Sequence, residues 1–233
     1  MIDGGHTNVA VIVAHPDDEV LGFGGTMALH AERGHTVSVL FLATGLASRL
    51  RAGETVSPEA IAELRADARA AGDLLGVSHI EFADFPDNQM DSVPLLHVVQ
   101  RIADFVAKTG ATLIYTHHMG DLNIDHGITA RAVLTACRPL PGAQVTKIYA
   151  GEVLSSSEYG VPEDRFRPNT YVDISTKLDA KRDALAKYAS ELRYWPHPRS
   201  IKAIAMLARL RGAEVGVDAA EALVLLRNVI AKI

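Results

Sequence analysis

Two short clusters of histidine and aspartate carry residue types that could bind a catalytic metal. The first is His15-Pro16-Asp17-Asp18-Glu19, which follows an apolar run over residues 8–14. The second ends at Asp125-His126, about half way along the chain. Zinc accepts histidine nitrogens and aspartate oxygens, and a catalytic zinc usually has three protein ligands and one open position. The two clusters therefore predict a metal site with room for a reacting molecule.

The spacing within the clusters suggests which residues would be the ligands. His15 and Asp18 are three residues apart, so a turn can bring both to one ion while Asp17 points elsewhere. His126 can supply the third ligand, and two histidines with one aspartate suit zinc or iron(II). The alternative is a helix cap with acidic residues near the positive helix end, which is how we interpret Glu19. The presence of both clusters favours the metal site.

Strands and helices alternate along the first 137 residues in a pattern that would position these clusters. Strands are expected at residues 8–14, 37–42, 79–82 and 111–115, and helices at 21–33, 58–75, 94–108 and 128–137. This alternation predicts an α/β fold with a Rossmann-like, mostly parallel sheet flanked by helices. Such sheets bind ligands beyond the carboxyl ends of their strands. Each cluster follows a predicted strand, so both should lie at that edge.

The pattern becomes less regular beyond about residue 142. A strand is expected at 171–174, and helices at 177–192 and 200–211, separated by Trp195-Pro-His-Pro198, where two prolines prevent helix continuation. We expect one domain over residues 1–233, with a core from about 8 to 175 and a C-terminal helical extension over about 176–233; edge strands and helices together extend the sheet at its C-terminal end. Tyr194, Trp195 and His197 could form a sugar-stacking wall or pack in a core or interface.

Composition excludes several classes of function. A net charge of -5 and a pI near 6.0 give no excess of positive charge for nucleic acid, so a small-molecule partner is expected. Cys137 is the single cysteine, which excludes an intramolecular disulfide, and we expect it to be buried on a helix. No secretion signal is visible, and no apolar run approaches the roughly 18 residues of a membrane span. We therefore expect a cytoplasmic enzyme.

The paired motif resembles a known family. Ala14-His15-Pro16-Asp17-Asp18-Glu19 together with Asp125-His126 is similar to the PIG-L / LmbE-like family of zinc-dependent N-acetylglucosaminyl de-N-acetylases, over residues 8 to about 175. The resemblance implies a hydrolase that removes an N-acetyl or other N-acyl group from an amino sugar or sugar conjugate. It implies Zn²⁺, or Fe²⁺ or another divalent metal, as cofactor. Homo-oligomerisation is a further expectation from the family.

The resemblance also implies a role for each matched residue. The implied roles are metal ligand for His15, Asp18 and His126, general base for Asp17, support of a neighbouring histidine for Asp125, and substrate binding for Arg65 and Asp87. One position departs from the family, because Asn123 stands where many members have a histidine. The Asn123 amide can donate a hydrogen bond to an oxyanion but cannot deliver a proton.

The departure at Asn123 leaves the proton donor open. Asp17 could return the proton it has taken, or His117 or His118 could replace the missing histidine, although either could equally pack beneath its loop. We expect His118 to be the donor. Two alternative functions remain: an amidase acting on a non-sugar or thiol-conjugate amide, and a catalytically idle metal- or sugar-binding module. A carboxylate at Asp17 beside the metal argues against the idle module.

Overall fold

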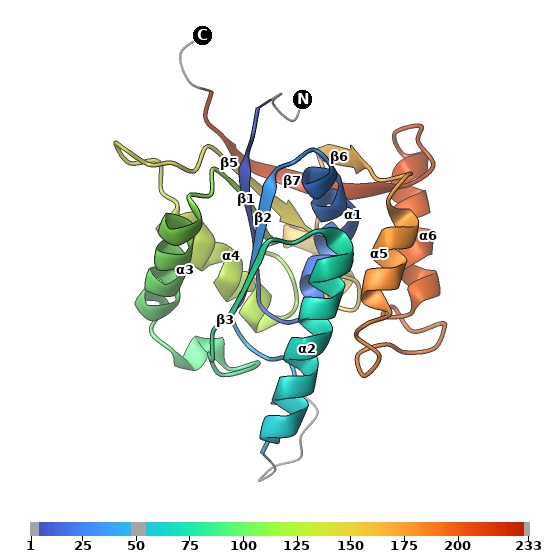
Figure 1. The fold of residues 1–233 in the computed structure, drawn as a ribbon, viewed down its shortest axis with the longest axis horizontal. Coiled ribbons are helices and arrows are strands. Elements are labelled where there is room, and N and C mark those ends of the chain that lie inside the picture. Colours follow the sequence, from blue (N-terminus) through green and yellow to red (C-terminus); the bar gives the residue numbers. More distant parts are fainter. Residues whose placement is uncertain (1–4, 48–54, 231–233) are drawn as a thin grey trace.

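A mixed sheet crosses the centre of the molecule (Figure 1). The computed structural model describes residues 5–47 and 55–230, and within them the sheet has seven strands in the order β3-β2-β1-β4-β5-β7-β6. The strands are β1 (Asn8–Val13), β2 (Thr36–Phe41), β3 (His79–Phe82), β4 (Leu113–His117), β5 (Lys147–Gly151), β6 (Thr170–Asp173) and β7 (Ala220–Asn228). Strands β1 to β5 are parallel, and β7 runs antiparallel between β5 and β6. The predicted α/β class with a mostly parallel sheet is confirmed.

Helices cover both faces of the sheet. They are α1 (Asp18–Glu32), α2 (Pro58–Leu75), α3 (Leu95–Thr109), α4 (Ile124–Ala136), α5 (Leu178–Leu185) and α6 (Ile201–Ala213), with short 3-10 helices at Met90–Ser92, Ser157–Tyr159 and Pro162–Asp164. Figure 1 shows α3 and α4 on one side of the sheet and α1, α2, α5 and α6 on the other. No helix in the described part of the chain is both long and apolar enough to cross a membrane.

Strand β1 explains why residues 8–14 show no polar face. Val9, Val11 and Val13 belong to the core under α1, α2 and α5, whereas Ala10 and Ile12 belong to the core under α3 and α4. All five side chains are buried. A strand buried on both faces is continuously apolar, and it fixes the loop that follows it between two packed layers.

Local capping sets the ends of two helices. Helix α2 spans the predicted residues because the Ser57 hydroxyl accepts from the Ala60 N–H, Pro58 occupies the first turn, and Gly76 ends the helix at φ 73°. Helix α4 begins at Ile124, earlier than the predicted residue 128, because the Asn123 side chain accepts from the Asp125 N–H at 2.9 Å. The early start places Asp125 and His126 in the first turn of α4.

The C-terminal half differs most from the sequence prediction. The expected strand at 171–174 is the edge strand β6, but β5 and β7 were not predicted, and β7 is internal rather than at an edge. Helix α5 ends at Leu185 instead of continuing to residue 192. Cys137 is buried at the end of α4 as expected, and burial raises its pKa to about 11. The predicted domain limits at residues 1 and 233 lie outside the described residues.

Candidate metal centre

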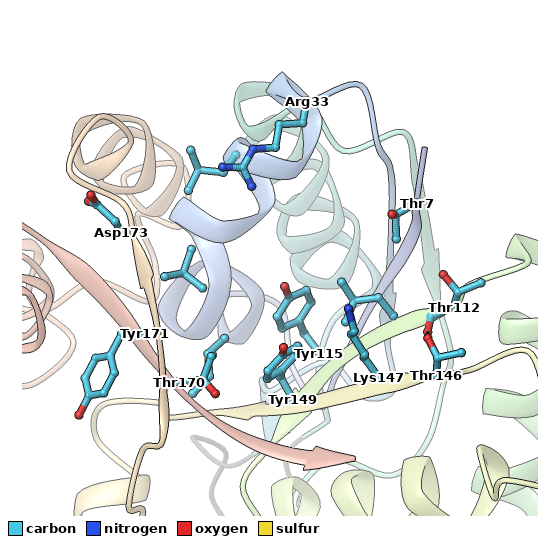
Figure 2. Close-up of a pocket in the computed structure, with 14 residues that line it drawn as sticks. Thr7, Arg33, Thr112, Tyr115, Thr146, Lys147, Tyr149, Thr170, Tyr171 and Asp173 are labelled. Carbon is cyan, nitrogen blue, oxygen red and sulfur yellow. The ribbon is translucent and has the colours of Figure 1, made fainter. Parts of the chain in front are cut away.

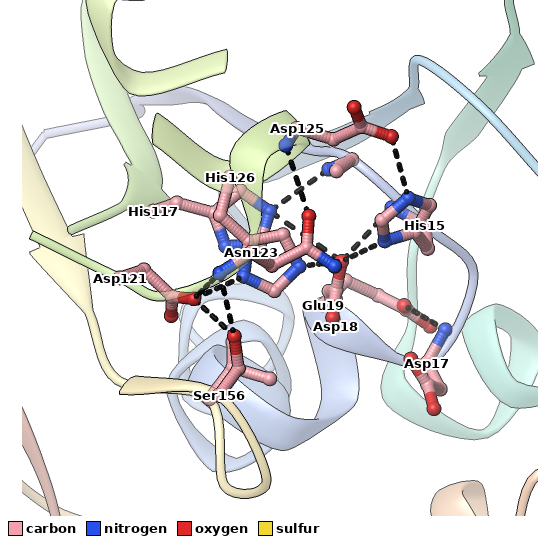
Figure 3. A network of polar contacts seen from close by, with 12 residues as sticks. His15, Asp17, Asp18, Glu19, His117, Asp121, Asn123, Asp125, His126 and Ser156 are labelled. Carbon is pink, nitrogen blue, oxygen red and sulfur yellow. Dashed lines mark hydrogen bonds and ion pairs between the residues drawn. The ribbon is translucent and has the colours of Figure 1, made fainter. Parts of the chain in front are cut away.

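Both motif clusters lie at the carboxyl edge of the sheet, as the sequence predicts. Strands β1 and β4 are parallel neighbours, with Val11 paired to Tyr115, so the loops that follow them emerge side by side. The first loop leads into α1 and the second into α4. Figure 3 shows the side chains of His15, Asp18 and His126 converging between the two helices.

Three side chains form a compact set of potential metal ligands. One ligand atom from each of His15, Asp18 and His126 lies within 4.8 Å of the others, and all three residues are buried. Asp18 Oδ2 is 3.2 Å from His126 Nε2 and 3.4 Å from His15 Nδ1. Asp18 Oδ1 and His126 Nε2 make no hydrogen bond to any described residue. Buried polar atoms without partners are costly, so these two atoms fit a bound cation.

A carboxylate lies beside one ring nitrogen of each of the two histidine ligands, His15 and His126. His15 Nε2 lies 3.1 Å from Asp125 Oδ2, and His126 Nδ1 lies 3.1 Å from Asp121 Oδ1. Ser157 donates to Asp121 at 2.5 Å, and Ser156 donates to the same carboxylate. A carboxylate on the second ring nitrogen fixes the orientation and tautomer of a histidine ligand. Asp121, which the sequence did not distinguish, thus lies beside His126 as an ion-pair partner, while Asp125 is hydrogen-bonded to His15.

A second group of potential ligands shares His15 with the first. It consists of His15, Asp87 and Asp125. Both Asp125 oxygens already accept backbone N–H groups, from Asn88 at 2.7 Å and from Met90 at 3.1 Å. Since Asp18 and His126 have unused atoms and Asp125 does not, the first group is the better metal site.

The charges around the ligand set also favour a cation. Burial would lower the pKa of His126, but Asp18 and Asp121 outweigh it and raise this pKa to about 9. Burial would raise the pKa of Asp18, but His126 and His117 hold it well below its usual value. The carboxylates thus draw positive charge into the site, and a divalent metal supplies that charge while leaving the histidines neutral.

Asp17 adopts a backbone conformation that is unusual for its type. Its φ is 108°, in the left-handed region, which costs about 1–3 kcal/mol for a residue with a side chain. Glu19 holds this turn, because its Oε2 accepts the Asp17 N–H at 3.0 Å while its Oε1 accepts the Tyr188 hydroxyl at 2.5 Å. Burial raises the pKa of Glu19 to about 8. Glu19 is therefore part of the support of the site, not simply a first-turn acidic residue.

The Asp17 side chain is buried but reaches the cavity beside the ligand set. Arg199 Nη1 lies 2.9 Å from Asp17 Oδ2, and Asp17 Oδ1 accepts no hydrogen bond from the described residues. Burial raises the pKa of Asp17 to about 6, although Arg199 opposes this shift. A carboxyl group with this pKa can exchange a proton near neutral pH.

A cavity of about 200 Å³ reaches the ligand set at His15. Its lining residues are His15, Pro16, Asp17, Thr44, Gly45, Asn88, Asn123, Glu191, Arg193, His197 and Arg199. The last four come from the segment between α5 and α6, so part of the C-terminal extension lines the cavity. Of these four residues, the sequence indicated only His197, as part of a possible sugar-stacking wall, whereas Tyr194 and Trp195 of that group line a different cavity.

The other predicted site residues lie in different places. Asn123 lines the cavity, and its amide donates to Asn88 Oδ1 at 3.2 Å. Asp87 lies behind His15, with Oδ1 3.1 Å from Nε2, rather than in the cavity lining. Arg65 is not brought to the site, because it pairs with Asp84 at 2.5 Å beside a separate cavity.

The two neighbouring histidines of the second loop have different surroundings. His117 Nε2 accepts the Ala14 N–H at 2.8 Å, and the ring stacks on His126. Burial, with His126 adding to it, lowers the pKa of His117 to about 3, so it does not donate a proton at neutral pH. His118 accepts the Gly120 N–H at 3.1 Å and packs edge-on against Phe166. His118 does not line the cavity, so its position does not support the proton-donor role predicted for it.

A larger cavity of about 370 Å³ lies at the opposite edge of the sheet. Figure 2 shows it near the amino ends of β4 and β5, with Thr112 and Thr146 on one side and Tyr115 and Tyr149 below. None of the predicted site residues lines it. The smaller cavity, which is lined by the predicted site residues His15, Asp17 and Asn123, is therefore the site of interest.

Comparison with known proteins agrees with this geometry. The family model for PIG-L, described as GlcNAc-PI de-N-acetylase, matches residues 10–137. The chain belongs to the PIG-L family. The family resemblance predicted from the paired motif is confirmed.

Proteins similar to this chain include two kinds of enzyme. A 4-oxalmesaconate hydratase of Pseudomonas putida is 29% identical over 198 residues, covering 80% of this chain and 75% of that protein. A probable N-acetyl-alpha-D-glucosaminyl L-malate deacetylase of Bacillus cereus is 25% identical over 188 residues, covering 79% of this chain and 83% of that protein. Both classes of reaction therefore occur among proteins similar to this chain.

Solved structures show the same fold over nearly the whole chain. The 4-carboxy-2-hydroxymuconate hydratase of Pseudomonas putida has a TM-score of 0.78 at 25% identity, covering 97% of this chain and 99% of that one. The N,N'-diacetylchitobiose deacetylase of Pyrococcus horikoshii has a TM-score of 0.75 at 19% identity, covering 94% of this chain and 83% of that one. The second likeness shows the fold alone.

Proposed function

We propose that this PIG-L protein is a metal-dependent hydrolase that removes an N-acetyl or other N-acyl group from an amino sugar or sugar conjugate. The observation that carries the proposal is the Asp17 carboxyl group in the cavity, beside the buried set of His15, Asp18 and His126. The orphaned Asp18 and His126 atoms fit a divalent ion, for which we propose zinc, with iron(II) as the alternative. Bound there, the metal would polarise the carbonyl oxygen and acidify water.

The residues around this ligand set would transfer the proton, stabilise the oxyanion and hold the general base. Asp17 takes a proton from the attacking water and, with its raised pKa, returns it to the departing nitrogen. Asn123, which lines the cavity, donates the amide hydrogen that is not bonded to Asn88 to the developing oxyanion. Glu19 and Arg199 hold Asp17 in place. With these roles, no step of the reaction requires a histidine at the position of Asn123.

An assay for new primary amine tests the proposal. Metal-replete protein is incubated with a panel of N-acetylated amino sugars and sugar conjugates, and Asp17→Asn with the same metal content is the matched control. We expect amine release by the wild type and little by the variant. Absence of amine release from every N-acylated compound would contradict the proposed hydrolase.

A hydratase is the second candidate, favoured by the 29% identity to 4-oxalmesaconate hydratase and by Asn123. Adding water across a carbon–carbon double bond has no amine leaving group, so it needs no separate acid to protonate nitrogen. Asp17 would again handle the proton. Loss of ultraviolet absorbance from an unsaturated dicarboxylic or tricarboxylic acid, without amine release from any amide, would assign this activity instead.

A further inference from the structure

The segment between α5 and α6 presents basic side chains to the metal-site cavity. Arg193, His197 and Arg199 line it together with the acidic residues Asp17 and Glu191. This segment lies outside residues 10–137, which match the family model. Its side chains therefore add to the site something that the paired motif does not contain.

Arg199 and Arg193 differ in the groups that their guanidinium ions contact. Arg199 Nη1 lies 2.9 Å from Asp17 Oδ2 and 3.5 Å from Glu191 Oε2, so its charge is balanced within the site. Arg193 Nη1 instead donates to the backbone carbonyls of Ser190 and Leu192, both at 2.8 Å. Arg193 forms no ion pair with any carboxylate in the part of the chain that the structure describes.

The backbone contacts orient the Arg193 guanidinium without neutralising it. With Nη1 fixed by two carbonyls, the remaining N–H groups of the planar fork stay available to a ligand at the cavity. A planar fork of this kind matches a carboxylate, which it can bind through two parallel hydrogen bonds. Arg193 is thus a cation held in place beside the cavity without an acidic partner.

His197 offers a second donor on the same wall. Its Nδ1 accepts the Arg199 N–H at 3.0 Å, so the neutral ring carries its hydrogen on Nε2. His197 also lines the cavity. Together, Arg193 and His197 supply a charged fork and a ring N–H donor from one short segment.

We propose that the substrate carries a carboxylate, which Arg193 binds with His197 Nε2–H as a second donor, while the N-acyl group lies beside Asp17. This inference rests on the proposed function, because it names the class of substrate for that site. A carboxylate suits the cavity better than a phosphate, since Asp17 and Glu191 also line it and repel a second negative charge.

Matched acid and ester substrates test the inference. N-acetylmuramic acid, an N-acetylated amino sugar with a lactyl carboxylate, is compared with its methyl ester. We expect wild-type kcat/KM to be about 10–100-fold higher for the acid, as a charge-assisted pair provides. In Arg193→Gln the acid-to-ester ratio should fall to near 1, mainly through a higher KM for the acid. Arg193→Lys, which keeps the charge but not the fork, should retain part of the preference.

A control variant and a binding measurement complete the test. Arg209→Gln removes an exposed arginine of α6 and should keep the wild-type ratio. Calorimetric titration with succinate, on folded variants of equal metal content, reports the carboxylate subsite even if no amide is cleaved. We expect succinate affinity to fall about tenfold or more in Arg193→Gln but not in Arg209→Gln.

The two measurements separate failure of the subsite from failure of the proposed function. Loss of succinate affinity in Arg193→Gln, without amine release from any amide, would retain the carboxylate subsite and reject the hydrolase. Equal succinate affinity in wild type and Arg193→Gln would overturn the inference. It would also be overturned if inorganic phosphate bound more tightly than succinate through Arg193.

Discussion

Arg199 Nη1 lies 2.9 Å from Asp17 Oδ2, across a sequence separation of 182 residues. This pair joins the segment before α6 to the strained turn that carries the proposed general base. Asp17 is almost fully buried, whereas the Arg199 side chain is 23% exposed. The positive charge that accompanies the base thus comes from outside the motif that predicts the site.

Removing Arg199 should therefore affect both stability and turnover. In Arg199→Gln the buried Asp17 carboxyl group loses its charged partner, and we expect the free energy of unfolding to fall by roughly 1–3 kcal/mol, less than for a fully buried pair. Turnover should fall about 10–100-fold because Asp17 is no longer held. Urea unfolding and steady-state kinetics measure the two effects, with Arg209→Gln as the control. Wild-type turnover in Arg199→Gln would show that Asp17 needs no such partner.

Asp17→Asn should separate catalysis from metal binding. The amide occupies the same space but cannot take a proton, so turnover should fall about 10²–10⁴-fold while metal content and melting temperature remain close to the wild type. Elemental analysis and amine release are measured on the same samples. Loss of the metal in this variant would make Asp17 a ligand, and normal turnover would assign the base to another group.

Metal binding should depend on the ligands and on the carboxylates behind them. His126→Ala should lose most of its metal, whereas Asp121→Asn should keep the site but weaken its affinity about 10–100-fold, because His126 is no longer oriented. Competition with a chelator of known affinity measures both. Full occupancy in His126→Ala would contradict the assigned site, and unchanged affinity in Asp121→Asn would remove Asp121 from it.

Asn123 and His118 should differ in their contribution to turnover. Asn123→Ala removes the cap of α4 as well as an amide donor that lines the cavity, and in samples of wild-type metal content we expect turnover to fall about 10²-fold if that donor contacts the oxyanion. His118→Ala removes a ring outside the lining, and its effect should stay within about twofold. If His118→Ala instead loses turnover and the alkaline limb of its pH profile, the sequence-based proton-donor role is correct.

Stability should fall at acidic pH because of a buried histidine far from the metal ligands. His30 Nε2 lies 2.8 Å from the Tyr115 hydroxyl and its Nδ1 lies 2.8 Å from His35 Nδ1, and burial lowers the pKa of His30 to about 4. Between about pH 4 and pH 6.5, His30 is protonated in the unfolded chain but stays neutral in the folded chain. The stabilisation is therefore complete above about pH 6.5 and is lost as the pH falls toward 4.

A difference between two proteins isolates this contribution. Each pH unit in that window changes the free energy of unfolding by about 1.4 kcal/mol per proton, so wild type should lose about 2 kcal/mol more than His30→Gln between pH 6.5 and 5. Glutamine keeps a hydrogen-bonding group toward Tyr115 but does not titrate. Urea unfolding at both pH values measures the difference, and parallel losses in the two proteins would show that His30 is not responsible.

The sequence predicted the N-terminal half of the fold well because its signals are local. The β-branched run of β1, the Ser57-Pro58 start of α2 and its Gly76 stop each determine structure within a few residues. The ligand set of His15, Asp18 and His126 was predictable because parallel neighbouring strands place their following loops together.

The C-terminal half was predicted poorly because its structure depends on distant partners. Residues 220–228 (AEALVLLRN) are rich in helix-forming types, yet they form β7 because β5 and β6 pair with them on both sides. Glu221 is tolerated inside that strand because it accepts from Lys181 and from the Gly25 and Thr26 N–H groups. The cavity residues Arg193, His197 and Arg199 are likewise positioned only by tertiary contacts.

The internal position of β7 has a consequence for the order in which the protein can fold during synthesis. Residues 147–151 and 170–173 leave the ribosome well before residues 220–228, but among the described strands they are joined only through β7. Until β7 inserts, one side of β5 and the inner side of β6 are open edges with unpaired backbone groups, which invite pairing with other chains. Completion of the sheet is thus a late event that closes both edges at once, and the nascent protein is most exposed to aggregation just before it.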